Sequence, residues 1–302
     1  MAGVRMSKDL RDRSRRELLK SLALAGLALG PFGRARAAAG PAKENPMSRV
    51  FITGSTDGLG LLAARALITE GHQVVLHARS RERAAAVADL APRAAGVVIG
   101  DLSSAAETRA IAAQVNALGR MNAVIHNAGV YEVPDRGATP EGHARTLTVN
   151  TLAPYLLTAL IERPDRLVYL SSGMHAGAAS SLHDMDWLER RWDASAAYSE
   201  SKLYLTALAF AVARHWPKML SNAVNPGWVP TKMGGAGATD DLTLGYLTQT
   251  WLAVSNDPQA QVSGGYWFHR KREKPAAAVS DAGFQDRLMA RLAELTGVAL
   301  FQ

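Results

Sequence analysis

The stretch VFITGSTDGLG, residues 50–60, places a short apolar run directly before a turn that contains three glycines. Residues 61–71, LLAARALITEG, follow with the spacing of an amphipathic helix. Strand, glycine-rich turn and helix in this order can hold a dinucleotide phosphate. Gly54 permits the tight turn, Gly58 lets the backbone approach the phosphates, and Gly60 allows close helix packing. A glycine cluster also occurs where a loop simply ends, so this stretch alone leaves both interpretations open.

The rest of the chain repeats the alternation of strand and helix. Continuously apolar runs indicate strands that are covered on both faces. Such runs occupy residues 73–78, 96–100, 122–126, 167–170 and 221–224. Helical periods occupy residues 81–91, 105–118 and 197–216. This order predicts one α/β domain over residues 48–302, a Rossmann-like, doubly wound parallel sheet with helices on both faces.

The positive charge of the chain is concentrated at its N-terminus. Residues 1–39 hold nine Lys or Arg and three acidic residues, which leaves the body nearly neutral although the whole chain has a net charge of +7. A nearly neutral body argues against nucleic-acid binding. The chain has no cysteine, which excludes disulfides and thiolate metal sites, and we expect no bound metal.

Residues 1–39 have the organisation of an export leader. Arg15-Arg16 precede the apolar stretch 21–30 and the small residues ARAAA at 35–39, and the pair resembles the twin-arginine export motif. The apolar stretch is too short to form a stable membrane span. Residues 40–47 read as a linker, and we expect export out of the cytoplasm. The alternative is translation from Met47, which would leave a cytoplasmic protein.

The glycine spacing and the motifs that follow it resemble the short-chain dehydrogenase/reductase family. Its TGxxxGxG turn corresponds to residues 53–60, and its NNAG motif appears as residues 126–129 with His126 in place of the first Asn. The resemblance extends to about Trp267, and further matched residues lie within it. They are Asp101, Asn150, Ser172, Tyr198, Lys202 and the segment NPGWVPT at residues 225–231. The resemblance implies an oxidoreductase that transfers a hydride between a nicotinamide cofactor and a carbonyl or alcohol.

The same resemblance assigns the catalytic residues. Tyr198 would exchange the proton with the substrate oxygen, and Ser172 would orient the carbonyl, with Ser171 as the competing serine. Lys202 lies one helical turn from Tyr198, and it is expected to lower the phenol pKa and to hold the nicotinamide ribose. Asn150 is expected to hold a water that links Lys202 to solvent.

Cofactor contacts are implied along the whole set of motifs. At the end of the second strand, Arg79 stands where an acidic residue would hold the ribose hydroxyl of NAD, which favours NADP(H) over NAD(H). The expected contacts are Gly54, Ser55, Thr56, Gly58, Leu59, Gly60, Arg79, Asp101, Leu102, Asn127, Ala128, Gly129, Tyr198, Lys202, Pro226, Gly227, Val229 and Thr231.

Two segments are expected to shape the substrate site. The long insert between Ser172 and Tyr198 resembles that of the retinol-dehydrogenase-like branch, and residues 233–242 are rich enough in glycine to form a mobile lid. Neither segment names the small-molecule substrate. The resemblance further implies a homodimer or homotetramer. The competing function is a catalytically silent NADP-binding sensor or scaffold on the same fold.

Overall fold

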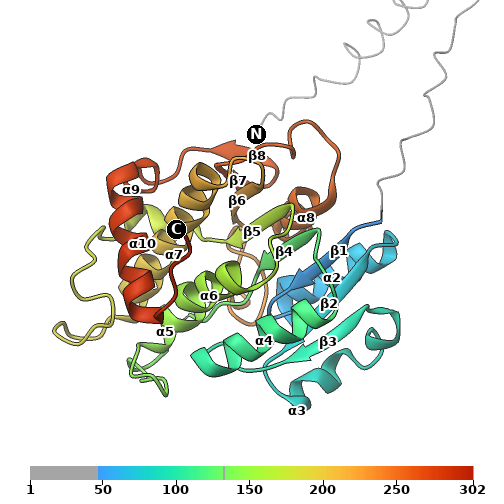
Figure 1. Ribbon diagram of the computed structural model, residues 1–302, viewed down its shortest axis with the longest axis horizontal. Coiled ribbons are helices and arrows are strands. Elements are labelled where there is room, and N and C mark those ends of the chain that lie inside the picture. The colour runs from blue at the N-terminus through green and yellow to red at the C-terminus, as the bar shows by residue number, and fades with distance from the viewer. Residues whose placement is uncertain (1–46, 132, 302) are drawn as a thin grey trace, which may run out of the picture. The chain divides into compact units, whose positions relative to one another are not determined.

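The computed structural model describes residues 47–131 and 133–301, and these are built around one eight-stranded sheet (Figure 1). The predicted leader at residues 1–39 and the linker up to residue 46 lie outside the described residues. The strands lie in the order β3-β2-β1-β4-β5-β6-β7-β8, and all are parallel except β8, which pairs antiparallel with β7. Their bounds are Arg49–Ile52 (β1), Gln73–Ala78 (β2), Gly96–Ile99 (β3), Ala123–His126 (β4), Arg166–Leu170 (β5), Leu220–Asn225 (β6), Gly265–Phe268 (β7) and Lys271–Glu273 (β8).

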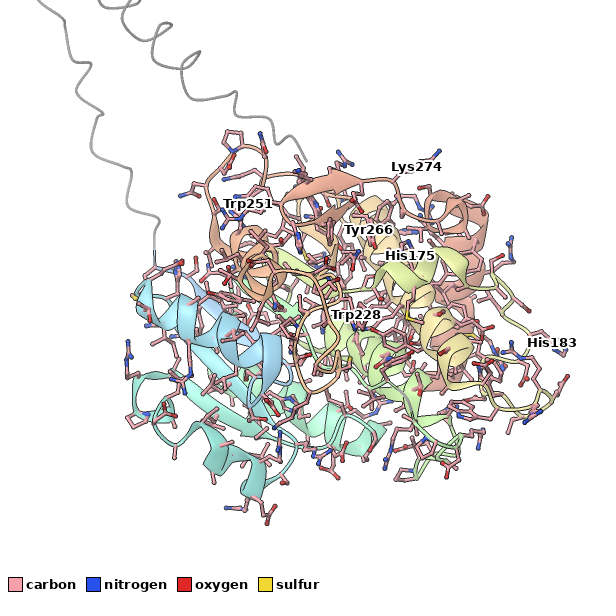
Figure 2. The ribbon with its side chains drawn as sticks, turned by 180° about the vertical axis from the view of Figure 1, so that it is seen from behind. His175, His183, Trp228, Trp251, Tyr266 and Lys274 are labelled. Carbon is pink, nitrogen blue, oxygen red and sulfur yellow. The ribbon has the colours of Figure 1, made fainter. Side chains whose placement is uncertain are left out.

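Helices cover both faces of the sheet, as the sequence predicted. In β1, Phe51 belongs to one core cluster, while Val50 and Ile52 belong to the other. This alternation requires an apolar layer on each side, since neighbouring side chains in a strand point to opposite faces. One layer contains α4 (Ala105–Ala117), α6 (Ala153–Leu160), α7 (Ala194–His215) and α10 (Ala282–Thr296), and the other contains α2 (Gly58–Thr69) and α8 (Leu242–Val254) (Figures 1 and 2).

Aspartate and serine side chains fix where the main helices begin. Asp57 caps α2 by accepting a hydrogen bond from Gly58 N, and Asp193 caps α7 by accepting one from Ala196 N. Such caps satisfy backbone donors that the first helical turn leaves free. The cap at Asp193 therefore sets the position of Tyr198 and Lys202 on α7 relative to the sheet.

The structure departs from the sequence prediction at two places. Residues 81–91 form only the short helix α3 (Arg81–Ala84) followed by 3-10 turns at 85–87 and 91–93, where Pro92 cannot continue a helical hydrogen-bond ladder. The strands β7 and β8 were not predicted. They are joined by a tight turn in which His269 and Arg270 adopt positive φ angles of 47° and 62°.

The carboxyl ends of β1, β4, β5 and β6 meet at one edge of the sheet. Ligands in open α/β sheets bind at this edge. Within the described residues, no helix combines the length and the apolar character needed to cross a bilayer.

Candidate active site

Hydrogen bonds from the segment after β4 hold the glycine turn after β1 in place. Asn127 Nδ2 donates to Thr53 O at 2.9 Å and to Gly54 O at 3.2 Å. Gly54 has a φ of +64°, and a Cβ added to Gly60 would lie 2.4 Å from both Asn127 Nδ2 and Gly54 O. A side chain at Gly60 would thus push α2 away from the turn, which is the packing role that the sequence assigned to this glycine.

A buried histidine also holds the turn. Gly54 N donates to His77 Nδ1 at 2.9 Å, so the proton of the ring sits on Nε2, which donates to Gly100 O at 2.9 Å. Burial lowers the pKa of His77, so the ring is held neutral. Ser55 is fully buried, and its hydroxyl accepts a hydrogen bond from His77 N. Ser55 therefore faces the neighbouring strand.

A cavity of about 480 Å³ opens between this turn and α7. Besides Tyr198 and Lys202, twelve of the residues expected to bind cofactor line it: Gly54, Thr56, Gly58, Leu59, Arg79, Asp101, Leu102, Asn127, Ala128, Gly129, Pro226 and Thr231. The expected residues outside its lining are Ser55, Gly60, Asn150, Ser172, Gly227 and Val229.

The cavity carries more positive than negative side chains. Arg83, Arg145 and Lys232 join Arg79 in its lining, which also includes the buried amine of Lys202. The acidic residues there are Asp57 and Asp101. Such an excess of cations suits a ligand with several phosphate charges.

Asp57 forms ion pairs with two of the cationic side chains that line the cavity beside the glycine turn. Its carboxylate pairs with Lys232 Nζ at 2.5 Å and with Arg83 Nη2 at 3.3 Å, and it also accepts from Gly58 N at 2.8 Å. The hydrogen bond from Lys232 is the main cause that holds the Asp57 pKa below its usual value. Arg79 is exposed and lines the cavity without competing in this cluster.

Tyr198 lines the cavity and is 8% exposed. Burial raises the pKa of Tyr198 to about 12, and the hydrogen bond with Ser172 acts in the opposite direction. The competing serine is engaged elsewhere, since Ser171 Oγ lies 2.5 Å from Thr206 Oγ1. Ser172 is therefore the serine beside the phenol, although Ser171 contributes to the cavity wall.

Lys202 is 3% exposed and reaches under the phenol ring. Its Nζ donates to Leu170 O at 2.7 Å and lies 5.6 Å from the centroid of the Tyr198 ring. A Cβ on Gly129 would lie 3.2 Å from this Nζ, so the glycine leaves room for the amine. Burial lowers the pKa of Lys202 to about 7.

The direction of the Tyr198 pKa differs from the sequence-based expectation. Lys202 was expected to lower the phenol pKa, whereas in the protein alone burial favours the uncharged form of both side chains. The reason is that desolvation opposes each charge. An acidic phenol here needs the two groups to ionise together as a pair, or further positive charge beside them.

Asn150 lies in η3 (Thr148–Leu152), one turn of π-helix between α5 (Arg145–Leu147) and α6. Its side chain is fully buried and forms hydrogen bonds with Val130 N at 2.9 Å, Val130 O at 3.0 Å and Ser201 Oγ at 3.0 Å. π-Helical turns occur preferentially at functional sites. Here the turn joins the segment after β4 to α7 beside Lys202.

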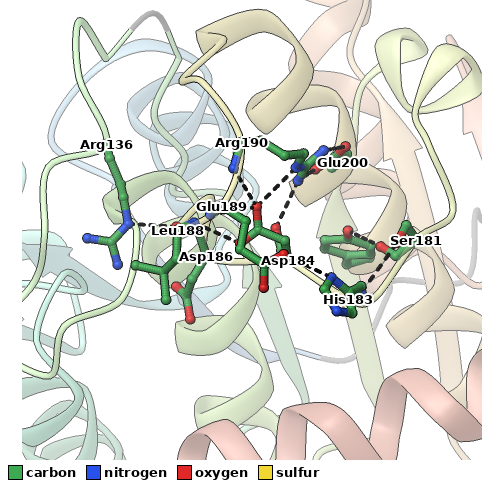
Figure 3. Close-up of polar contacts among 10 residues, drawn as sticks. Arg136, Ser181, His183, Asp184, Asp186, Leu188, Glu189, Arg190 and Glu200 are labelled. Atoms are coloured by element: carbon green, nitrogen blue, oxygen red, sulfur yellow. Dashed lines mark hydrogen bonds and ion pairs between the residues drawn. The ribbon is translucent and has the colours of Figure 1, made fainter.

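The insert between Ser172 and Tyr198 is tied to α7 by charged groups (Figure 3). Arg190 forms a bidentate pair with buried Glu200 on α7, at 2.8 and 2.9 Å, and its Nε lies 3.2 Å from Asp184. Asp186 of the insert accepts from Ala144 N and pairs with His143 at 2.8 Å. These contacts hold the insert in one arrangement against both α7 and the segment after β4.

The histidines of the insert have structural surroundings. His175 lies in η4 (Gly173–Gly177), with Nδ1 bonded to Ser172 O at 2.7 Å and Nε2 accepting from Ala276 N at 3.1 Å. His183 is exposed and lies 3.6 Å from Glu189. Neither lines the cavity, and the same holds for the insert's buried Trp187. Within the described residues, no group of three or more His, Asp or Glu side chains could hold a metal ion.

Comparison with known proteins identifies the family. Residues 48–241 match the family model described as short chain dehydrogenase. The chain belongs to the short-chain dehydrogenase family. The short-chain dehydrogenase chyC of Penicillium rubens is 41% identical over 258 residues, covering 84% of this chain and 99% of that relative. Human retinol dehydrogenase 13 is 29% identical, covering 84% of this chain and 86% of its own. A crystal structure of a protein from Mycobacterium paratuberculosis has a TM-score of 0.71 at 25% identity, covering 84% and 95% of the two chains.

This short-chain dehydrogenase is therefore an oxidoreductase, and its family binds a nicotinamide cofactor. The one altered motif position, His126, is accommodated in the core. Its ring stacks on Tyr169 at 4.7 Å, its Nε2 lies 3.2 Å from Thr158 Oγ1, and burial lowers its pKa to about 3. The neutral imidazole of His126 therefore takes the place of the asparagine amide without adding a buried charge.

Sequence reasoning missed several residues that shape the site. His77 and Tyr131 belong to no motif, and only the fold brings them to the turn and to Tyr198, whose ring lies 4.6 Å from that of Tyr131. Lys232 was passed over although it directly follows the predicted contact Thr231. Arg83 lies in the basic run that follows Arg79, but no motif distinguished it from Arg81.

Proposed function

We propose that this short-chain dehydrogenase transfers a hydride between NADP(H) and a carbonyl or alcohol substrate, with Tyr198 as the acid and base. One observation carries the proposal. The hydroxyl group of Tyr198 lies beside Ser172, the buried amine of Lys202 lies near the same ring, and Tyr198 and Lys202 both line a cationic cavity. A catalytically silent binding protein would have no need to bury a phenol and an amine together beside a serine hydroxyl.

The residues of the cavity fit a nicotinamide dinucleotide. Gly54 and Gly58 have positive φ angles, and a Cβ on Gly58 would meet only Thr231, at 3.8 Å, so the backbone of the turn stays open to a phosphate. The N-terminus of α2 begins at Gly58 and favours an anion there. When bound, the dinucleotide supplies or accepts the hydride.

The protein's own groups would manage the proton. In carbonyl reduction, the carbonyl carbon gains the hydride, the C=O π electrons move to oxygen, and the phenol proton of Tyr198 forms the new O–H bond. Ser172 would donate a hydrogen bond to the same oxygen. Negative charge left on Tyr198 would raise the proton affinity of Lys202, so the amine would take up one proton from solvent and form an ammonium beside the phenolate. Transfer of that proton to the phenolate would restore both neutral groups. Oxidation of an alcohol follows the reverse order.

The preference for NADP(H) rests on the arginines near the end of β2. Arg79 is exposed and lines the cavity, so its guanidinium group is available to a 2′-phosphate, and Arg83, which pairs with Asp57, adds positive charge to the same lining. No acidic side chain follows β2 before Glu82, where an NAD-selective site would place one for the ribose hydroxyls. Comparing the dissociation constants of NADPH and NADH would test this preference.

A panel of aldehydes and ketones would test the activity itself. NADPH absorbance at 340 nm should fall with at least one carbonyl compound, or should rise from NADP⁺ with an alcohol. A protein that binds NADPH tightly but turns over none of a broad panel would instead be a sensor or scaffold. Tyr198 and Lys202 would then have no chemical task.

We further propose that residues 1–39 are a twin-arginine leader that directs export, and that the enzyme assembles as a homodimer or homotetramer. The leader proposal rests on the sequence alone. Labelling the N-terminus of the protein made by its native host would test the leader, because a chain that starts at Met47 would be cytoplasmic. Light scattering of the purified protein would give the assembly state.

A further inference from the structure

Trp228 is an exposed indole that the protein holds in place. It is 56% exposed, yet its Nε1 donates to Gly234 O at 2.8 Å, and its ring lies 3.7 Å from where a Cβ of Gly237 would be. The loop that carries it is closed at its base, since Asp240 accepts from Trp228 N at 2.6 Å and Asp240 N donates to Trp228 O at 2.9 Å. The predicted lid segment is thus tied back on itself around the indole.

The loop that carries this indole borders the cavity, although Trp228 itself is not part of the cavity lining. It follows Pro226, which lines the cavity with Tyr198, and Met233 of the same loop lines that cavity as well. The loop after β5 abuts this region, because a Cβ on Gly173 would lie 3.3 Å from Asn225 Nδ2. Trp228 lies near the centre of the face seen in Figure 2.

Met233 on the same loop and Met174 on the loop after β5 are further exposed apolar side chains. Of the seven large hydrophobic side chains exposed in the described residues, five follow β5 or β6: Met174, Leu188, Trp228, Met233 and Leu244. Met174 lies two residues beyond Ser172 and is 38% exposed. Exposed apolar surface beside a reaction site indicates a binding surface rather than chance.

The charges of the Trp228 loop are already paired within the protein. Lys232 binds Asp57 on the phosphate side of the cavity, and Asp240 binds the backbone of Trp228. The cavity therefore has cationic side chains for the dinucleotide, while the Trp228 loop presents a fixed aromatic face and the thioether of Met233. Tyr131 adds a second aromatic ring against Tyr198.

We propose that Trp228 is a specificity-determining residue that stacks on a planar, uncharged apolar group of the substrate, such as an aromatic ring system next to the reacting carbonyl. The fixed orientation of the indole supports this occupant, because a stacking platform binds best when its ring is already immobilised. The proposal rests on the proposed function and deepens it by naming the substrate class.

The test compares two ketones that differ in planarity: methyl 2-naphthyl ketone and its fully saturated decalin counterpart. Binding of each to the NADPH complex is measured by calorimetry, and turnover is measured by NADPH absorbance, for the wild type, Trp228→Ala and Trp228→Phe. Leu118→Ala is the matched control, an exposed apolar residue at the end of α4. Light scattering records the assembly state of each variant.

We expect Trp228→Ala to weaken binding of the planar ketone roughly five-fold or more, with little change for the saturated ketone. KM should follow the binding constant while kcat changes little, since stacking away from the reacting atoms is lost equally from ground and transition states. Trp228→Phe should recover most of the loss, and Leu118→Ala should match the wild type.

Equal binding of both ketones by the wild type, or an equal loss of both in Trp228→Ala, would overturn the inference. A changed assembly state without a change in selectivity would also overturn it, and would assign the indole to an interface between copies of the chain. Selective binding of the planar ketone without any turnover would refute the proposed function and leave the inference standing. Turnover of aliphatic ketones alone would support the proposed function and refute the inference.

Discussion

Replacing Lys202 by methionine should stabilise the cofactor-free enzyme, and the gain should depend on pH. The side chain is 3% exposed, and burial lowers its pKa from 10.5 to about 7. At 1.36 kcal/mol per pH unit, this difference corresponds to roughly 5 kcal/mol of unfavourable burial when the amine is protonated. Methionine has a similar length and carries no charge.

The net gain is smaller than this figure because the substitution also removes a hydrogen bond. Leu170 O accepts from Lys202 Nζ at 2.7 Å, and leaving that carbonyl without its donor costs about 1–3 kcal/mol. We therefore expect Lys202→Met to raise the free energy of unfolding by roughly 2–4 kcal/mol at pH 6.

The direction of the pH dependence follows from proton binding. Below pH 7 the amine is protonated in both states, so the wild type carries the full cost of burial. Between about pH 7 and 10.5 the unfolded chain holds the proton that the folded protein has released, so wild-type stability rises with pH. The advantage of Lys202→Met should therefore shrink as pH rises through this range.

Urea unfolding at pH 6 and pH 9.5 would measure both effects, with the exposed Lys218→Met as control. The reasoning is refuted if Lys202→Met is less stable than the wild type at pH 6, or if its advantage is the same at both pH values. A stabilised but inactive variant would indicate that this lysine is kept for function at a cost in stability.

Three further substitutions test other parts of the site. Arg79→Asp should weaken NADPH binding ten-fold or more and leave NADH binding unchanged or improved, as fluorescence titration of both cofactors would show; equal losses would contradict the assignment. Gly60→Ala should lose about 1–3 kcal/mol of stability and most of its cofactor affinity, because the new Cβ would meet Asn127 Nδ2 at 2.4 Å; calorimetry and thermal melts would check this. Arg190→Met should lose about 3–5 kcal/mol in urea unfolding by leaving buried Glu200 unpaired, and adding Glu200→Leu should recover most of that loss; no recovery would show that the ion pair is not the cause.

Sequence periodicity predicted six strands and the doubly wound architecture because strands buried on both faces are continuously apolar. It missed β7 and β8, whose connecting turn places His269 and Arg270 in a conformation that glycine or asparagine would normally signal. It extended the helix after β2 as far as residue 91, because an alanine-rich run such as AAAVADLA favours helix, although the chain there forms only α3 and two short 3-10 turns, the second of which contains Pro92.

The candidate site was predictable where ordered motifs carry it and obscure where the fold alone creates it. Tyr198, Lys202 and the glycine turn have fixed spacings in the chain. The contact between His77 and Gly54 joins β2 to the turn after β1 and has no local signal. The pKa directions of Tyr198 and Lys202 were also beyond sequence reasoning, because they depend on how deeply the fold buries each side chain.

Single-turnover kinetics of Tyr198→Phe test the central role of the phenol most directly. Phe keeps the ring over Lys202 and removes only the exchangeable proton, so NADPH should bind with nearly wild-type affinity while hydride transfer slows by at least ~10². A Tyr198→Phe variant that binds NADPH and reduces its substrate at the wild-type rate would show that another group moves the proton.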